Sequence, residues 1–108
     1  ISDIIRSIPE LIDDAVKRAF LKILMNYPKI EDEELLAILM NYCFRYLESH
    51  YETVAVKIYS MEILYHISNS VPEIKNELIA IIEEQVRRGT PAIKVTGQRK
   101  LKKLYMEV

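Results

Sequence analysis

Side chains that could bind a metal or act as a nucleophile are few in this sequence and lie far apart. The two histidines, His50 and His66, do not form the H-x-x-x-H or H-E-x-x-H spacings of zinc sites. Glu62 and His66 stand at i and i+4, where a surface pair is the usual outcome. Cys43 is the only cysteine and falls on an apolar helical stripe, so we expect a buried, reduced thiol. With only two glycines there is no glycine-rich phosphate loop, and we expect no catalytic residue, metal or cofactor.

Positive charge is concentrated at the C-terminal end of the chain. Residues 87–108 carry seven Lys or Arg and one Glu, a net charge of +6, whereas residues 1–86 carry eight Lys or Arg and fifteen Asp or Glu, a net charge of −7. Clustered cations are what phosphate binding requires, although cations also gather at helix C-termini. The candidate nucleic-acid contacts are Arg87, Arg88, Lys94, Arg99, Lys100, Lys102 and Lys103.

The elements that must position these side chains are all helical. Apolar residues recur at three- and four-residue spacing throughout, and no segment alternates with period two. The pattern predicts five to six helices, over residues 1–11, 13–26, 30–49, 53–69, 71–88 and 91–106. Within the first, Pro9 either kinks the helix or follows a new start at Ser7.

Several helix boundaries carry capping signals. The acidic run at residues 31–34 favours a helix start, and Glu52 or Thr53 caps the next helix. Ser70 and Glu73 form an S-x-x-E capping signal with Pro72 in the first turn. Gly89 is predicted to end the following helix in a left-handed conformation.

The segment at residues 53–67 is apolar on most of its circumference. Only Lys57, Ser60, Glu62 and His66 interrupt it, so this helix must be buried on more than one side. It is also one copy of an internal repeat. Residues 15–24 and 55–64 are identical at five of ten positions, and residues 92–94 follow residues 55–57 at an offset of thirty-seven. A helix pair repeating every ~40 residues is the period of HEAT and armadillo arrays.

The openings D-x-A-V-K (residues 13–17) and T-V-A-V-K (residues 53–57) resemble the second helix of HEAT repeats. This resemblance implies a short α-solenoid of two and a half to three helix hairpins in a single domain over residues 1–108, with repeats at about 1–27, 28–69 and 70–108. It also implies that the second helices line a concave surface. In such a solenoid each repeat buries its apolar face against its neighbours.

One strip of each second helix would face that surface. In the central copy, Ala55, Tyr59, Glu62 and His66 lie at i, i+4, i+7 and i+11. Mapping them through the repeat offsets gives a candidate partner-binding strip, unless these residues are merely the solvated side of three helices. Its members are Lys22, Asn26, Tyr59, Glu62, His66, Thr96, Arg99 and Lys103.

Lys17, Lys57 and Lys94 recur at one repeat position. The resemblance implies a structural ladder in which each lysine pairs with an acidic side chain such as Asp13, Asp14 or Glu52, and a row of phosphate contacts is the alternative. We expect Gly97, in the same repeat as Lys94, to permit close helix packing.

The resulting hypothesis is a non-enzymatic scaffold that binds another protein through its concave face. The alternative is a HEAT-like domain that binds nucleic acid through the C-terminal cations, as the DNA-alkylpurine glycosylases of that superfamily do. Those enzymes use a catalytic carboxylate beside aromatic, often tryptophan-containing surfaces, and this chain has no tryptophan. An unrecognised enzyme is a third reading, distinguished by a deep pocket with convergent polar groups.

The cellular setting is expected to be the cytoplasm, since a lone cysteine fits a reducing compartment. No apolar run approaches the ~20 residues of a membrane span. The chain begins at Ile1 rather than methionine, and we interpret it as a candidate fragment of a longer protein.

Overall fold

A computed structural model describes residues 18, 21, 22, 24 and 32–107. Across residues 32–107 it forms four α-helices and one short 3₁₀ turn, η2 (Pro72–Ile74). The helices are α3 (Glu33–Glu48), α4 (Val54–Ser70), α5 (Lys75–Arg88) and α6 (Pro91–Glu107). No strand occurs in these residues, which confirms the all-α prediction.

Four helices are fewer than the five to six predicted for the whole chain. The expected helix over residues 1–11 lies outside the described residues, and so does most of the one over 13–26. Leu21 and Leu24, which are described, are helical and 1% and 3% exposed, so they belong to the core.

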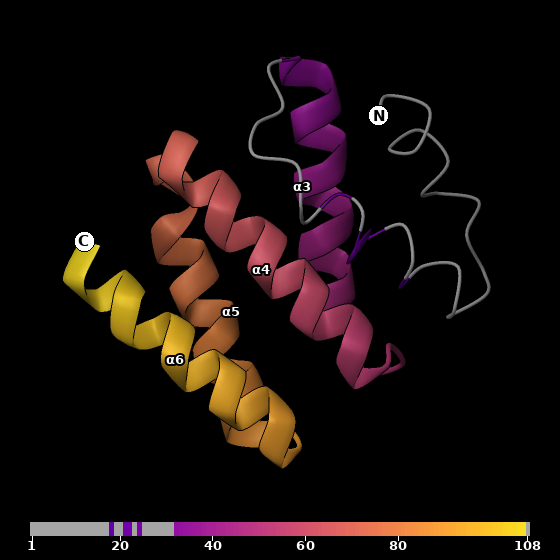
Figure 1. Cartoon of the computed structure of the whole chain (residues 1–108), viewed down its shortest axis with the longest axis vertical. Coiled ribbons are helices and arrows are strands. Elements are labelled where there is room, and N and C mark those ends of the chain that lie inside the picture. The colour runs from indigo at the N-terminus through magenta and orange to yellow at the C-terminus, as the bar shows by residue number, and fades with distance from the viewer. Residues whose placement is uncertain (1–17, 19–20, 23, 25–31, 108) are drawn as a thin grey trace.

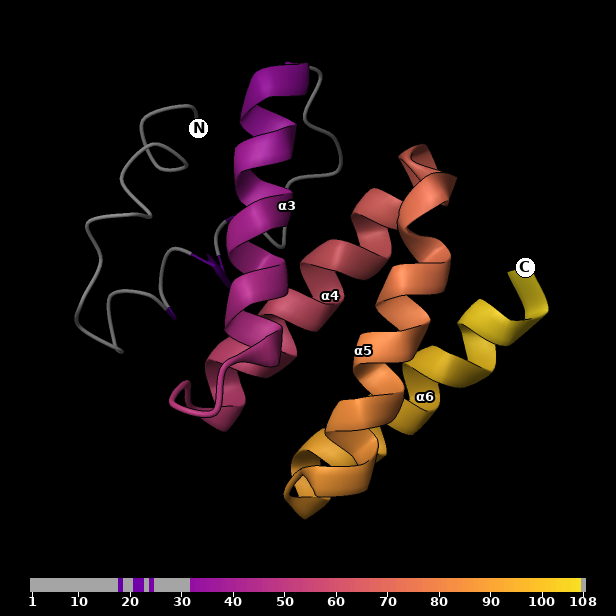
Figure 2. The same ribbon diagram turned by 180° about the vertical axis from the view of Figure 1, so that it is seen from behind.

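The four helices form two hairpins that stack side by side. Helix α3 packs on α4 and α5 packs on α6, while α4 also contacts α6 and α3 also contacts α5. Figure 1 shows α4 and α6 running side by side in one layer, and Figure 2, the view from the other side, shows α3 and α5 in front as the second layer. The apolar core lies between the two layers and along the junction of the hairpins.

Helix α3 follows the sequence prediction closely. Asp32 caps it, since one carboxylate oxygen accepts from the backbone N–H groups of Glu34 at 2.9 Å and Leu35 at 3.1 Å. The predicted stripe is buried or half-buried, at Leu35, Leu36, Leu39, Tyr42, Cys43, Tyr46 and Leu47. The side chains predicted to face outward, at Ala37, Asn41, Arg45 and Glu48, are exposed.

Helix α4 is buried on several sides, as its apolar composition predicts. It is capped by Thr53 and contacts α3, α5 and α6. Its buried positions are Val56, Ser60, Met61, Ile63, Leu64, Ile67 and Ser68. Because it joins both hairpins, α4 holds the stack together.

The predicted cap at Ser70 is wrong, and Gly89 ends α5 as predicted but without the predicted left-handed conformation. Ser70 is the last residue of α4 rather than a cap, and the chain enters η2 from Val71 with no side-chain capping bond. Helix α4 continues one residue beyond the predicted end at residue 69 and so incorporates Ser70. Gly89 has φ −82° and ψ 171°, which is extended backbone rather than a left-handed cap. A Cβ at Gly89 would lie 2.6 Å from Ile93 Cγ2, so close packing is what requires glycine there.

Gly97 lies where α6 crosses α5. A Cβ at this position would lie 2.6 Å from Val86 Cγ2 and 3.3 Å from Ile82 Cγ2. Normal carbon–carbon contacts are roughly 3.5–4.0 Å. The prediction that Gly97 permits close helix packing is therefore confirmed.

Candidate functional site

None of the strip positions predicted on α4 and α6 is among the buried residues of these helices. His66, Arg99 and Lys103 are exposed, and Tyr59, Glu62 and Thr96 are half-buried. Because α4 and α6 lie side by side (Figure 1), we group these side chains of the two helices under the name α4/α6 face. Lys22 is exposed, and Asn26 lies outside the described residues.

A polar seam joins α4 to α6 beside this face. Lys100 Nζ pairs with Glu62 Oε2 at 2.7 Å, with side chains 7% and 24% exposed. The same ammonium lies 4.8 Å from the centroid of the Tyr65 ring, and Lys103 Nζ lies 5.6 Å from it. Glu62 and Lys100 therefore connect the two hairpins, and the Lys100 ammonium is not available to a phosphate backbone.

The seam continues to the end of α6 through Glu107. Its carboxylate accepts a hydrogen bond from the Tyr65 hydroxyl at 2.7 Å and pairs with Lys75 Nζ at 2.9 Å. The Tyr65 bond, followed by the Lys75 bond, lowers the pKa of Glu107. The same hydrogen bond raises the pKa of Tyr65. These contacts tie α4, α5 and α6 together.

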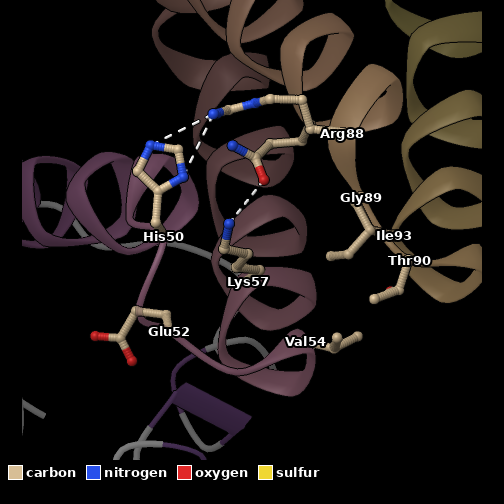
Figure 3. Close-up of a pocket in the computed structure, with 9 residues that line it drawn as sticks. His50, Glu52, Val54, Lys57, Arg88, Gly89, Thr90 and Ile93 are labelled. Carbon is tan, nitrogen blue, oxygen red and sulfur yellow. Dashed lines mark hydrogen bonds between the residues drawn. The ribbon is translucent and has the colours of Figure 1, made fainter.

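A pocket opens at the opposite end of the stack, between the turn that joins α3 to α4 and the turn that joins α5 to α6 (Figure 3). Its volume is about 240 Å³. Polar side chains of both hairpins line it, namely His50, Lys57, Gln85 and Arg88, and Val54 and Ile93 add apolar surface. Sequence reasoning did not bring these residues together.

The hydrogen bonds of this pocket cross between hairpins. Lys57 Nζ donates to Gln85 Oε1 at 2.8 Å, and Gln85 is only 3% exposed. Arg88 Nη1 lies 3.3 Å from both ring nitrogens of His50, while Arg88 Nε pairs with Glu84 at 3.0 Å. Burial, and then the charge of Arg88, lower the pKa of Lys57, and Glu52 acts in the opposite direction.

A model of the HEAT repeat domain family matches residues 1–104. The chain belongs to this family. No curated protein and no solved structure matches. The stacked hairpins α3–α4 and α5–α6 agree with the family's architecture, which confirms the resemblance seen in the repeated A-V-K openings.

Only two of the three lysines of the predicted ladder in this HEAT repeat domain, Lys57 and Lys94, are described by the structure. Lys17 lies outside the described residues, Lys94 is exposed, and the hydrogen-bond partner of Lys57 is the amide of Gln85 in the next hairpin. Glu52 acts on Lys57 through its charge. The ladder therefore stays a prediction, and the hydrogen-bond partner of Lys57 is a neutral amide rather than an acidic side chain.

The basic cluster divides into paired and unpaired cations. Arg87 and Arg88 both pair with Glu84 on α5, and the Arg87 bond is the main cause of the lowered pKa of Glu84. Lys94, Arg99 and Lys102 are exposed on α6 and make no ion pair with any other described residue. Within this basic cluster, the cations that have no ion pair to another described residue thus lie on α6.

Cys43 is fully buried between α3 and α4. Burial is the main cause of its raised pKa, about 12 against an ordinary value of 9.0, and the nearby Ser60 hydroxyl only partly offsets it. The thiol is therefore a core group, as its place on the stripe predicts.

Within residues 32–107 and the four described positions before them, no three His, Cys, Asp or Glu side chains gather as a metal site. In the same part of the chain no helix is long and apolar enough to cross a membrane.

Proposed function

We propose that this HEAT repeat domain is a non-enzymatic scaffold that binds a protein partner through the α4/α6 face. HEAT repeat domains are generally scaffolds that interact with other proteins. The observation that supports the proposal is that α4 and α6 pack against each other and that each exposes strip residues, His66 on α4 and Arg99 and Lys103 on α6. Such a face offers side chains at a regular repeat spacing.

The experiment compares capture of partners from cell extract by the domain and by face variants, followed by binding to the purified partner. His66→Ala and Arg99→Ala remove exposed side chains without opening the core. We expect each to weaken binding at least about tenfold if it is a central contact. Asn76→Ala, at an exposed position on α5, is the matched control. Unchanged binding by both face variants would reject the α4/α6 face.

Tyr59 is unsuitable as a first probe because it is half-buried against the core. Tyr59→Ala would lose packing as well as any partner contact, so reduced capture would have two explanations. Circular dichroism and thermal unfolding of every variant must therefore accompany the binding data.

A second candidate function, nucleic-acid binding, is favoured by one observation. Lys94, Arg99 and Lys102 are exposed and unpaired within the described residues. Against it stand the overall net charge of −1 and the pairing of Arg87, Arg88 and Lys100 with carboxylates. The α4/α6 face therefore supports a protein partner better.

Titration of labelled duplex DNA at two salt concentrations separates the two functions. Three phosphate contacts should weaken binding about 40-fold between 50 and 200 mM salt, from a slope of roughly −0.9 per phosphate. Arg99→Glu combined with Lys103→Glu should abolish such binding. If the dissociation constant changes neither with salt concentration nor in this double variant, the basic residues of α6 are excluded as a nucleic-acid site.

A further inference from the structure

The pocket at the turn end of the stack combines a cationic interior with apolar walls. Figure 3 shows the ammonium of Lys57 donating to Gln85 and a terminal nitrogen of Arg88 facing the ring of His50, and all four residues line the pocket. Val54 and Ile93 line the same cavity. A ligand that fits both kinds of surface has an anionic head and an aliphatic stem.

In the pocket the ammonium of Lys57 has no carboxylate partner among the described residues, and Arg88 shares the carboxylate of Glu84 with Arg87. The ammonium of Lys57 donates to a neutral amide, Gln85 Oε1. The terminal nitrogen Nη1 of Arg88 faces the ring of His50 rather than a carboxylate. The lowered pKa of Lys57 agrees with this, since burial and Arg88 disfavour its charge more than Glu52 favours it. An added anion between Lys57 and Arg88 would stabilise both.

Counting the nearby charges indicates which anion fits. Glu84 is shared by Arg87 and Arg88, and Glu52 lines the pocket near Lys57. Among the side chains that line the pocket, the cations Lys57 and Arg88 and the carboxylate of Glu52 leave one net positive charge, which matches a monoanion better than a dianionic phosphate group. Val54 and Thr90 lie at the first turns of α4 and α6, whose dipoles add further positive potential.

We propose that this pocket binds the carboxylate of a glutamate or aspartate side chain of the protein partner. The carboxylate would accept hydrogen bonds from Lys57 Nζ and Arg88 Nη1, and its methylene stem would pack against Val54 and Ile93. This inference rests on the proposed scaffold function and adds a specificity-determining contact to it. The pocket is made by two hairpins, so the acidic side chain would bind where they join.

The test is an NMR titration of the ¹⁵N-labelled domain with blocked glutamate (N-acetyl-glutamate methylamide). We expect saturable shifts of backbone amides at the pocket, with a dissociation constant on the order of millimolar for such a small ligand. Blocked glutamine has the same size and no charge, and it should produce no saturable shifts there. Inorganic phosphate, the third probe, should bind more weakly than blocked glutamate.

Three variants assign the binding to the pocket cations. Lys57→Met keeps the stem and removes the ammonium, and Arg88→Gln removes the guanidinium, so each should weaken binding about tenfold as a charged hydrogen bond is lost. Lys94→Gln is the matched control, because it removes one exposed cation of α6 that is not in the pocket. It should change binding less than about twofold, as expected for an exposed charge.

Three results would overturn the carboxylate site. They are equal shifts with glutamine, tighter binding of phosphate, and unchanged affinity in both Lys57→Met and Arg88→Gln. None of them bears on His66 or Arg99, so loss of partner capture by variants at those residues would still support the scaffold. Conversely, if blocked glutamate binds the pocket but variants of the α4/α6 face do not change capture of the partner, the face is rejected and the pocket is retained.

Discussion

Gly97→Ala offers a sharp test of how closely α5 and α6 pack. In an open helix interior this change would stabilise the protein by about 0.5–1 kcal/mol, because alanine loses less backbone entropy than glycine. Here the new methyl would lie 2.6 Å from Val86 Cγ2 and 3.3 Å from Ile82 Cγ2. Overpacking of this kind costs about 1–3 kcal/mol. The clash outweighs the helix propensity, and we expect a net loss of about 1 kcal/mol.

Thermal and urea unfolding followed by circular dichroism measure this loss. For a domain of this size, 1 kcal/mol corresponds to a fall in Tm of about 4–8 °C. Gln98→Ala, at the exposed neighbouring position, is the control and should change the free energy of unfolding by less than about 0.5 kcal/mol.

A double variant identifies the contact responsible. Val86→Ala removes the methyl that the new Cβ would meet, so Gly97→Ala should cost less, or even stabilise, in that background. A coupling free energy of about 1 kcal/mol between the two sites is expected. If Gly97→Ala alone stabilises the domain, or if the coupling is zero, α6 does not cross α5 at this register and the hairpin packing described above is wrong.

Three further predictions concern polar groups. Burial raises the pKa of Cys43 to about 12, so its thiol should react with a disulfide reagent at pH 8 at least about 100-fold more slowly in the native than in the unfolded chain. The contribution of this thiol to stability is present below pH 9.0 and is lost as pH rises toward 12. Lys100→Met leaves Glu62 half-buried and unpaired and should cost about 1–3 kcal/mol in urea unfolding, most of it recovered by adding Glu62→Met. Glu107→Gln should lower Tm at pH 7, and because the pKa of Glu107 is depressed below 4.5, the difference from the parent should shrink as pH falls below that value.

The helices and their buried sides could be predicted because their signals are local. The stripe of α3 from Leu35 to Leu47 needs only a period of 3.6 residues and an apolar core. The burial of α4 on several sides could be predicted from its lack of a continuous polar face. The pairing of α4 with α6 could be predicted from the match of residues 92–94 to residues 55–57, which marks equivalent positions in neighbouring hairpins.

The caps and the pocket could not be predicted in this way. Gly89 looked like a left-handed cap because glycine usually supplies one, but the nearby Ile93 side chain explains it here. Lys57 and Gln85 are 28 residues apart, and His50 and Arg88 are 38 apart. No local pattern specifies such pairs, which depend on how one hairpin sits on the next. Gln85 on an otherwise apolar side of α5 was the one signal available, since a buried amide requires a partner.

Polar contacts that cross between the hairpins imply a link between binding and stacking. Glu62–Lys100 joins α4 to α6, and Lys57–Gln85 joins α4 to α5, with the apolar core of both hairpins between them. A solenoid is stable only through the interfaces between neighbouring repeats. A carboxylate bound between Lys57 and Arg88 would add a contact that exists only when the hairpins are stacked. By linkage it must then stabilise that interface by as much as stacking favours its binding. An acidic partner at this pocket would therefore rigidify the same junction that positions the α4/α6 face.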